Sequence, residues 1–184
     1  MGTLTRAEAL RIFADAELIY DAAQVSAAVQ RVADGLNQAY ATRHPLVLSV
    51  MGGAVVFTGQ LLPKLNFPLD FDFIAASRYG DATTGRELTW RVAPRSNILD
   101  RDVIVVDDIL DEGITLAAIC DLIREQGAAS VATAVFSDKS IAKPKPISAD
   151  YVGLSLPNRF VFGFGMDVQG AWRNLPSIHA MKEA

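Results

Sequence analysis

The stretch VIVVDDILDEGIT, residues 103–115, decides the fold of this chain. Its first four residues form an unbroken β-branched run, which predicts a strand buried on both faces of a parallel sheet. Gly113 and Thr115 then open a predicted helix, because the apolar residues that follow them are spaced for one face. A strand that runs into a helix in this way indicates an α/β domain, in which ligands bind outside the carboxyl ends of the strands.

Two chemical features suit this stretch to a phosphorylated sugar. The free amide groups at a helix N-terminus attract phosphate, and here Gly113 lets the backbone come close while Thr115 adds a hydroxyl group. Asp107 and Asp108 accept hydrogen bonds when ionised, which fits sugar hydroxyls or a Mg2+-bound substrate. Other interpretations stay open. Adjacent Asp residues also bind Mg2+ in receiver domains, and Asp107 or Asp111 is equally compatible with a turn residue or a helix cap.

A second strand, turn and helix lie earlier in the chain. We expect a strand at residues 46–50, a tight turn at Met51-Gly52-Gly53 and a helix at residues 54–65. Such a turn either binds phosphate or is an ordinary connection between a strand and a helix, and the sequence leaves both open.

Asp21 and Gln24 predict a capping box for an amphipathic helix at residues 22–40.

The remaining elements follow from hydrophobic spacing and turn residues. A polar stretch at residues 77–87 is either a plain hairpin loop or a mobile lid that carries Arg78 and Tyr79. The segment Lys143-Pro-Lys-Pro146 is predicted to be a stiff surface connector, and the tail after Pro176 has no clear pattern. A short helix is expected at residues 5–14 and a short turn or helical piece at residues 171–175. Further strands are expected at residues 69–76, 88–92, 131–136, 151–154 and 160–162.

Composition narrows the class of protein. A chain of 184 residues with 51% hydrophobic content is expected to form a single domain with a real core. Its net charge of −4 argues against a nucleic-acid surface. The lone Cys120 is expected to be a buried structural thiol, and His44 and His179 are too isolated to indicate a metal site. No signal peptide and no apolar run of the ~20 residues needed to cross a bilayer are visible, so we expect a cytoplasmic protein with no membrane partner.

The acidic and glycine-containing part of the central stretch resembles the phosphoribosyl pyrophosphate (PRPP) binding motif of type I phosphoribosyltransferases. In that motif two acidic and two apolar residues precede Asp-Thr-Gly-x-Thr. Later segments resemble the hypoxanthine-guanine branch, namely Lys139, Phe160-Val-Phe-Gly-Phe-Gly-Met-Asp167 and Trp172-Arg173-Asn-Leu175. The resemblance runs in order from about Leu18 to Leu175. It implies a central parallel sheet flanked by helices in one domain over residues 1–184, with a small hood from N-terminal residues and about 150–184.

The resemblance also implies an activity. Ribose 5-phosphate would pass from PRPP to hypoxanthine or guanine, giving IMP or GMP and pyrophosphate, with Mg2+ as cofactor. A cis peptide bond is implied at Met51–Gly52, and metal ligands at Asp107, Asp108 and Asp167. The PRPP-binding residues would be Gly52, Gly53, Asp107, Asp108, Asp111, Glu112, Gly113, Ile114, Thr115 and Arg173.

On the purine side, the resemblance makes Asp111 the catalytic base that faces N7. Lys139 would donate to the 6-oxygen, which favours hypoxanthine or guanine over adenine because the adenine amino group is itself a donor. Phe160 would stack on the base, Val161 would offer its backbone to the ring edge, and Asp167 would hold the pyrophosphate-bound Mg2+. Taken singly, these residues also fit a solvated lysine, a core phenylalanine and a helix cap, and Arg173 fits a surface ion pair.

Several positions depart from the family pattern. Gly52 stands where lysine is common, Arg78 separates Ser77 from Tyr79 in the lid, and Ile114 also replaces a common lysine. Glu112 stands where the family has threonine, inside the phosphate site. Two charges 4 Å apart at an effective dielectric of about 20 repel by about 4 kcal/mol, whereas a helix N-terminus returns only ~0.3–1 kcal/mol. We therefore expect the Glu112 carboxylate to point to solvent while its amide binds.

These departures keep one alternative open, a non-catalytic regulator that uses the PRPP pocket as a sensor. A second alternative, a transferase that prefers another base such as xanthine, depends on what approaches C2 of the ring. The expected partners are PRPP, a purine base and pyrophosphate, and the resemblance implies a homodimer or homotetramer.

Overall fold

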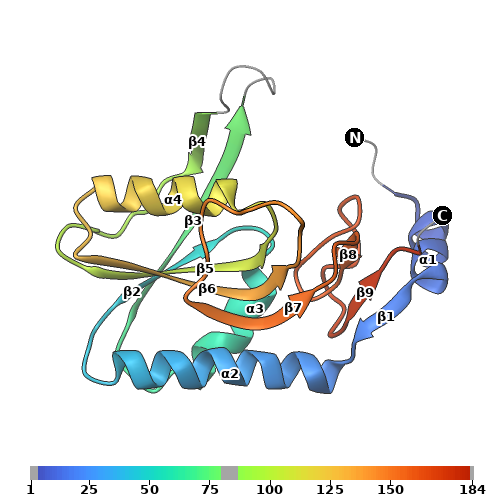
Figure 1. The fold of residues 1–184 in the computed structure, drawn as a ribbon, viewed down its shortest axis with the longest axis horizontal. Coiled ribbons are helices and arrows are strands. Elements are labelled where there is room, and N and C mark those ends of the chain that lie inside the picture. The colour runs from blue at the N-terminus through green and yellow to red at the C-terminus, as the bar shows by residue number, and fades with distance from the viewer. Residues whose placement is uncertain (1–3, 80–86, 183–184) are drawn as a thin grey trace.

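The computed structural model describes residues 4–79 and 87–182, with the backbone alone described at residues 77–79 and 87–90. Its centre is a six-stranded sheet in the order β4-β3-β2-β5-β6-β7 (Figure 1). All neighbours pair in parallel except β3 and β4, which are antiparallel. This confirms the predicted α/β fold with a mainly parallel sheet. The strands are β2 Leu46–Val50, β3 Asp70–Tyr79, β4 Glu87–Val92, β5 Asp102–Leu110, β6 Ser130–Lys139 and β7 Tyr151–Leu156.

Helices cover both faces of this sheet, and β5 contributes to both cores. On one face lie α2 Ala22–Tyr40, α3 Val55–Leu61 and the 3-10 turn η1 Leu62–Lys64, and on the other lies α4 Ile114–Glu125 (Figure 1). Side chains alternate along a strand, so Ile104 and Val106 of β5 pack in the first core and Val103 and Val105 in the second. All four are fully buried, as the β-branched run predicts.

A smaller antiparallel sheet lies beyond the end of β7. Its order is β1-β9-β8, formed by β1 Glu17–Tyr20, β8 Val161–Phe162 and β9 Ile178–Ala180. Helix α1, Arg6–Asp15, packs beside it through Trp172, whose Nε1 donates to the carbonyl of Ala9 at 2.8 Å. The Phe13 ring also lies 5.0 Å from the Trp172 ring, centroid to centroid. The two ends of the chain thus meet in one hood (Figure 1).

Several local predictions hold and some fail. The capping box of Asp21 and Gln24 is present, and β2 has the predicted bounds. The helix expected at residues 54–65 ends early, at Leu61, because Pro63 lacks the amide that a longer α-helix needs. Residues 171–175 form a bridge and a turn, which is the turn alternative of the prediction, and β9 lies in the unpatterned tail. None of the described helices is both long and apolar enough to cross a membrane.

Candidate functional site

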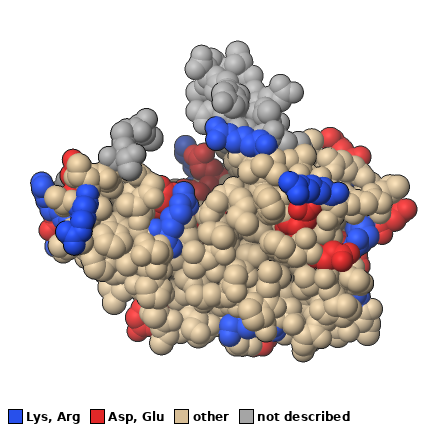
Figure 2. All heavy atoms as spheres, turned by 180° about the vertical axis from the view of Figure 1, so that it is seen from behind, with Lys and Arg blue, Asp and Glu red and all other residues tan. Residues whose placement is uncertain are grey.

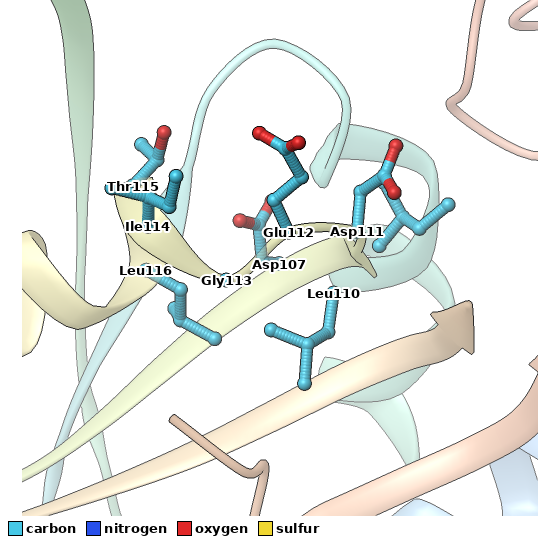
Figure 3. Close-up of a pocket in the computed structure, with 9 residues that line it drawn as sticks. Asp107, Leu110, Asp111, Glu112, Gly113, Ile114, Thr115 and Leu116 are labelled. Carbon is cyan, nitrogen blue, oxygen red and sulfur yellow. The ribbon is translucent and has the colours of Figure 1, made fainter. Parts of the chain in front are cut away.

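The loop between β5 and α4 forms the floor of a hollow of about 230 Å³. Gly113 caps α4 with φ of +77°, a left-handed conformation that glycine adopts without strain. Among the described residues no side chain caps this end of the helix, so its first amides are left available to a ligand. Figure 3 shows the side chains of Asp107, Asp111, Glu112 and Thr115 on the same side of the loop. The arrangement offers backbone amides and a hydroxyl group to an anion, next to carboxylates suited to hydroxyl groups.

Glu112 follows one part of the prediction made for it. Its side chain is exposed, as expected. However, its carboxylate rises beside the Thr115 side chain rather than away from the hollow (Figure 3), and it lines the hollow. The carboxylate thus meets solvent at the lining of the hollow, and binding through the Glu112 amide alone stays a prediction. Among the described residues the carboxylate has no hydrogen-bond or ion-pair partner.

The adjacent carboxylates Asp107 and Asp108 lie at the carboxyl end of β5, and each is partly buried. Burial raises the pKa of Asp107 well above its ordinary value, and the neighbouring Asp108 charge raises it further. Burial also raises the pKa of Asp108, against the opposing influence of a hydrogen bond with Asp107 and the Arg173 charge. The backbone is held as well, since Ser137 Oγ donates to the Asp108 carbonyl at 3.0 Å. The two adjacent carboxylates thus form an acidic site, which can bind a cation or accept hydrogen bonds from sugar hydroxyls.

The turn after β2 approaches this acidic pair. Its Met51–Gly52 peptide bond is cis, as the family resemblance implies. Gly53 lies directly against the Asp108 carboxylate, and its carbonyl oxygen faces Gly165 of the hood. The structure therefore brings the predicted glycine turn next to the β5–α4 loop, although the two are more than fifty residues apart in the sequence.

A second hollow, of about 200 Å³, lies between β5, β6 and the hood; we call it the base hollow. Across it Lys139 Nζ lies 3.1 Å from Asp111 Oδ2. The Phe160 side chain is 56% exposed at its edge, so it is a free ring for stacking rather than a core residue. Val161 is buried in β8. The lining residues are Asp108, Ile109, Asp111, Lys139, Phe160, Val161, Met166 and Asp167.

Asp167 and Arg173 form an ion pair on the hood side of the base hollow. Arg173 Nη2 lies 2.5 Å from Asp167 Oδ1, and Arg173 Nη1 donates to the Gly165 carbonyl at 2.6 Å. The other Asp167 oxygen accepts from the Gly170 amide at 2.7 Å. These contacts hold an arginine and a carboxylate in fixed positions near the acidic pair.

The surface of the molecule has a notch along its upper edge in Figure 2, where acidic and basic side chains lie together.

The structure thus brings together the predicted residues of β5, the glycine turn, β6 and the hood. Two predicted lid residues, Arg78 and Tyr79, lie at the end of β3, but their side chains and the following loop are outside the described residues. Sequence reasoning missed Ile109 and Met166 as lining residues. Strand alternation would not have found Ile109, because it packs partly against the first core while it lines the base hollow beside Asp108.

Possible metal ligands are dispersed over the site. In the part of the chain that the structure describes, no three histidine, cysteine, aspartate or glutamate side chains come together as a ready metal site. The oxygen ligands Asp107, Asp108 and Asp167 do suit Mg2+, which commonly takes one or two carboxylates and completes its shell with water and substrate phosphates. Cys120, fully buried on α4, is the expected structural thiol, and burial raises its pKa to about 11.

Comparisons with known proteins agree on one family. Residues 15–169 match the family model of the phosphoribosyl transferase domain. A hypoxanthine-guanine phosphoribosyltransferase of Streptococcus thermophilus is 33% identical over 91% of this chain and 93% of its own length. The bifunctional protein TilS/HprT of Listeria monocytogenes is 38% identical over 80% of this chain, which spans only 23% of that longer protein. A crystal structure of a hypoxanthine phosphoribosyltransferase from Staphylococcus aureus superposes with a TM-score of 0.87, at 27% identity, covering 94% of this chain and 95% of that chain.

Proposed function

Because the chain belongs to the phosphoribosyl transferase family, we propose that it transfers ribose 5-phosphate from PRPP to hypoxanthine or guanine. The products are IMP or GMP and pyrophosphate. One observation carries the choice of base, the 3.1 Å contact between Lys139 Nζ and Asp111 Oδ2. Oxopurines present O6 and N7 along a single edge. A lysine beside a carboxylate matches that edge, with Lys139 donating to O6 and Asp111 facing the N7 proton.

The β5–α4 loop and the acidic pair bind the sugar in this proposal. The amides of residues 111–115 and the Thr115 hydroxyl hold the 5-phosphate, helped by the positive end of α4. Asp107 and Asp108 accept from the ribose hydroxyls. Gly52 and Gly53 present their backbone to pyrophosphate, and Arg173 adds a positive charge there. The ordered contacts of Arg173 with the hood support this role, because they hold the guanidinium near Asp108 before a ligand arrives.

The reaction then requires three things from these residues. As the bond from the sugar to pyrophosphate breaks, positive charge develops on the sugar, and the nearby carboxylates stabilise it. The purine nitrogen attacks the sugar carbon, and Asp111 accepts the N7 proton as general base. Phe160 stacks on the purine, and the Val161 backbone meets its edge. A lid that includes Arg78 and Tyr79 excludes water, which would otherwise hydrolyse the sugar cation.

Mg2+ fits this site as a cofactor that arrives with the substrate. Asp107, Asp108 and Asp167 are oxygen donors on two sides of the site, and no closed cage is formed by the described residues. Bound with PRPP, Mg2+ would neutralise the pyrophosphate charge. Asp107 and Asp108 would hold it on the ribose side and Asp167 on the pyrophosphate side. Location in the cytoplasm and assembly into a homodimer or homotetramer stay predictions.

A direct assay tests the proposal against its two alternatives. Purified protein is incubated with PRPP and hypoxanthine, guanine, xanthine or adenine, with Mg2+ or with EDTA, and nucleotide formation is followed. We expect IMP and GMP to form only with Mg2+, and adenine to be a poor substrate. PRPP binding with no nucleotide formed from any base would favour the non-catalytic sensor. Fastest turnover of xanthine would reassign the substrate.

A further inference from the structure

Lys145 makes contacts that a surface connector would not make. It lies between β6 and β7, and its side chain is only 14% exposed. Lys145 Nζ donates to the Leu110 carbonyl at 2.7 Å, the Lys139 carbonyl at 2.6 Å and Asp138 Oδ1 at 2.5 Å. These three acceptors use all three donors of the ammonium group. The prediction that this segment is a plain surface connector is therefore wrong for Lys145.

The two carbonyls lie at the ends of neighbouring strands. β5 and β6 pair in parallel up to Leu110 and Asp138, which are the last paired residues. The Leu110 carbonyl belongs to the peptide group that enters Asp111, and the Lys139 carbonyl belongs to the peptide group that leaves Lys139. One ammonium group therefore joins the backbone on either side of the Asp111–Lys139 pair.

The same residue reaches the helix cap. A Cβ atom built on Gly113 would lie 3.5 Å from Lys145 Cβ and 3.3 Å from Ile147 Cγ2, so this connector covers the start of α4. Proline on both sides of Lys145 fixes two backbone torsions and reduces the number of conformations available to the segment. The connector thus has few conformations and contacts residues that line both hollows, Leu110 and Gly113 in the first and Lys139 in the base hollow.

We propose that Lys145 is a positioning residue, which holds the Asp111 and Lys139 backbones at a fixed separation. The inference rests on the proposed function, in which those two side chains recognise one edge of the purine. Lys139 Nζ and Asp111 Oδ2 lie 3.1 Å apart, and this spacing must be kept for the two groups to meet O6 and N7 on that edge. The bonds from Lys145 go to backbone carbonyls and involve neither side chain, so they persist when the base is bound. Without these bonds, the backbones of Asp111 and Lys139 would no longer be held at a fixed separation when the purine binds.

The test compares Lys145→Met with Lys143→Met. Met keeps most of the stem but removes the three donors, whereas Lys143 is an exposed neighbour with no hydrogen-bond or ion-pair partner among the described residues. We expect Lys145→Met to lower kcat/KM for hypoxanthine on the order of tenfold to hundredfold, the scale of a misplacement near 1 Å. The KM for PRPP should change less, and Lys143→Met should behave as the wild type. Lys145→Gln, which keeps a donor but falls short by one bond, should show the same pattern and serves if Lys145→Met does not fold.

A double-mutant cycle separates positioning from general destabilisation. If Lys145 acts through the Asp111–Lys139 edge, Lys145→Met should cost little once Lys139 is already Met. A loss by the same factor with and without Lys139 would overturn the inference, as would folded Lys145 variants that match Lys143→Met. Absence of turnover by the wild type would overturn the proposed function and this inference with it. An active wild type with unaffected Lys145 variants overturns the inference alone.

Discussion

Gly53 packs against Asp108 so closely that a methyl group placed on Gly53 would lie 1.9 Å from Asp108 Oδ2. On its other side, the Gly53 carbonyl oxygen would lie 2.1 Å from a Cβ atom built on Gly165. Gly52, next to it, has nothing within 4 Å of the corresponding position. The two glycines of one turn therefore differ, because one joins the acidic pair to the hood and the other faces open space.

Gly53→Ala should be destabilising, whereas Gly52→Ala should leave the free energy of unfolding unchanged. The added methyl group of Gly53→Ala must displace Asp108, and overpacking of this kind costs about 1–3 kcal/mol. Urea denaturation of the two variants measures the difference. The KM of Gly53→Ala for PRPP should rise as well, since Asp108 is its proposed ribose ligand. Equal stability of both variants would show that the Asp108 carboxylate is free to move away.

The raised pKa of Asp107 predicts an unusual dependence of stability on pH. The folded protein holds the Asp107 proton more tightly than the unfolded chain, whose pKa is near the ordinary 3.8. Its contribution to stability is therefore present at low pH and is lost as pH rises from 3.8 through the raised value. Asp107→Asn should be more stable than the wild type at pH 7 without Mg2+, and this advantage should disappear in acid.

Denaturation in EDTA over a series of pH values measures this effect. Asp121→Asn, which changes an exposed carboxylate on α4, is the matched control and should show no such gain. A destabilised Asp107→Asn at pH 7 would mean that the carboxylate is needed by the empty fold.

The parts of the fold that rest on local pattern could be predicted from sequence. The β-branched run at residues 103–106 is fully buried, and the helix capped by Asp21 begins where predicted. Both features are encoded by residues close together in the sequence, a run of apolar residues in one case and the spacing of Asp21 and Gln24 in the other. The acidic pair and the glycine turn were predictable for the same reason, since the pair lies near the end of β5 and the turn directly follows β2.

The rest depends on partners that are distant in the sequence. β9 has three residues, too few to show a period, and it exists because it pairs with β1 and β8. Lys145 binds two backbone carbonyls, which carry no residue-specific signal, and one of them lies thirty-five positions away. The direction of the Glu112 side chain likewise depends on the space around the loop, which its neighbours in sequence do not define.

Asp111→Ala should lower kcat by about 10²–10⁴-fold, the range expected for loss of a general base. PRPP binding should change far less, because the amides of the β5–α4 loop remain. Steady-state kinetics with hypoxanthine, together with calorimetric titration of PRPP, separates the two effects. Asp121→Ala is a suitable control, since it removes an exposed carboxylate on α4 that lies outside the base hollow. An unchanged kcat for Asp111→Ala would remove Asp111 from the role of base.

Glu112→Gln should lower the KM for PRPP, because it removes a negative charge that stands beside the proposed 5-phosphate site (Figure 3). The carboxylate is exposed, so solvent screens it, and we expect an effect of about 0.4–1 kcal/mol, or roughly two- to fivefold. Glu112→Thr, which restores the residue common in the family, should act in the same direction. The difference between wild type and Glu112→Gln should shrink as salt is added, because ions screen exposed charges. Initial rates over a range of PRPP and salt concentrations test this. A higher KM for Glu112→Gln would mean instead that the carboxylate itself assists binding, for example by accepting from a group on the substrate.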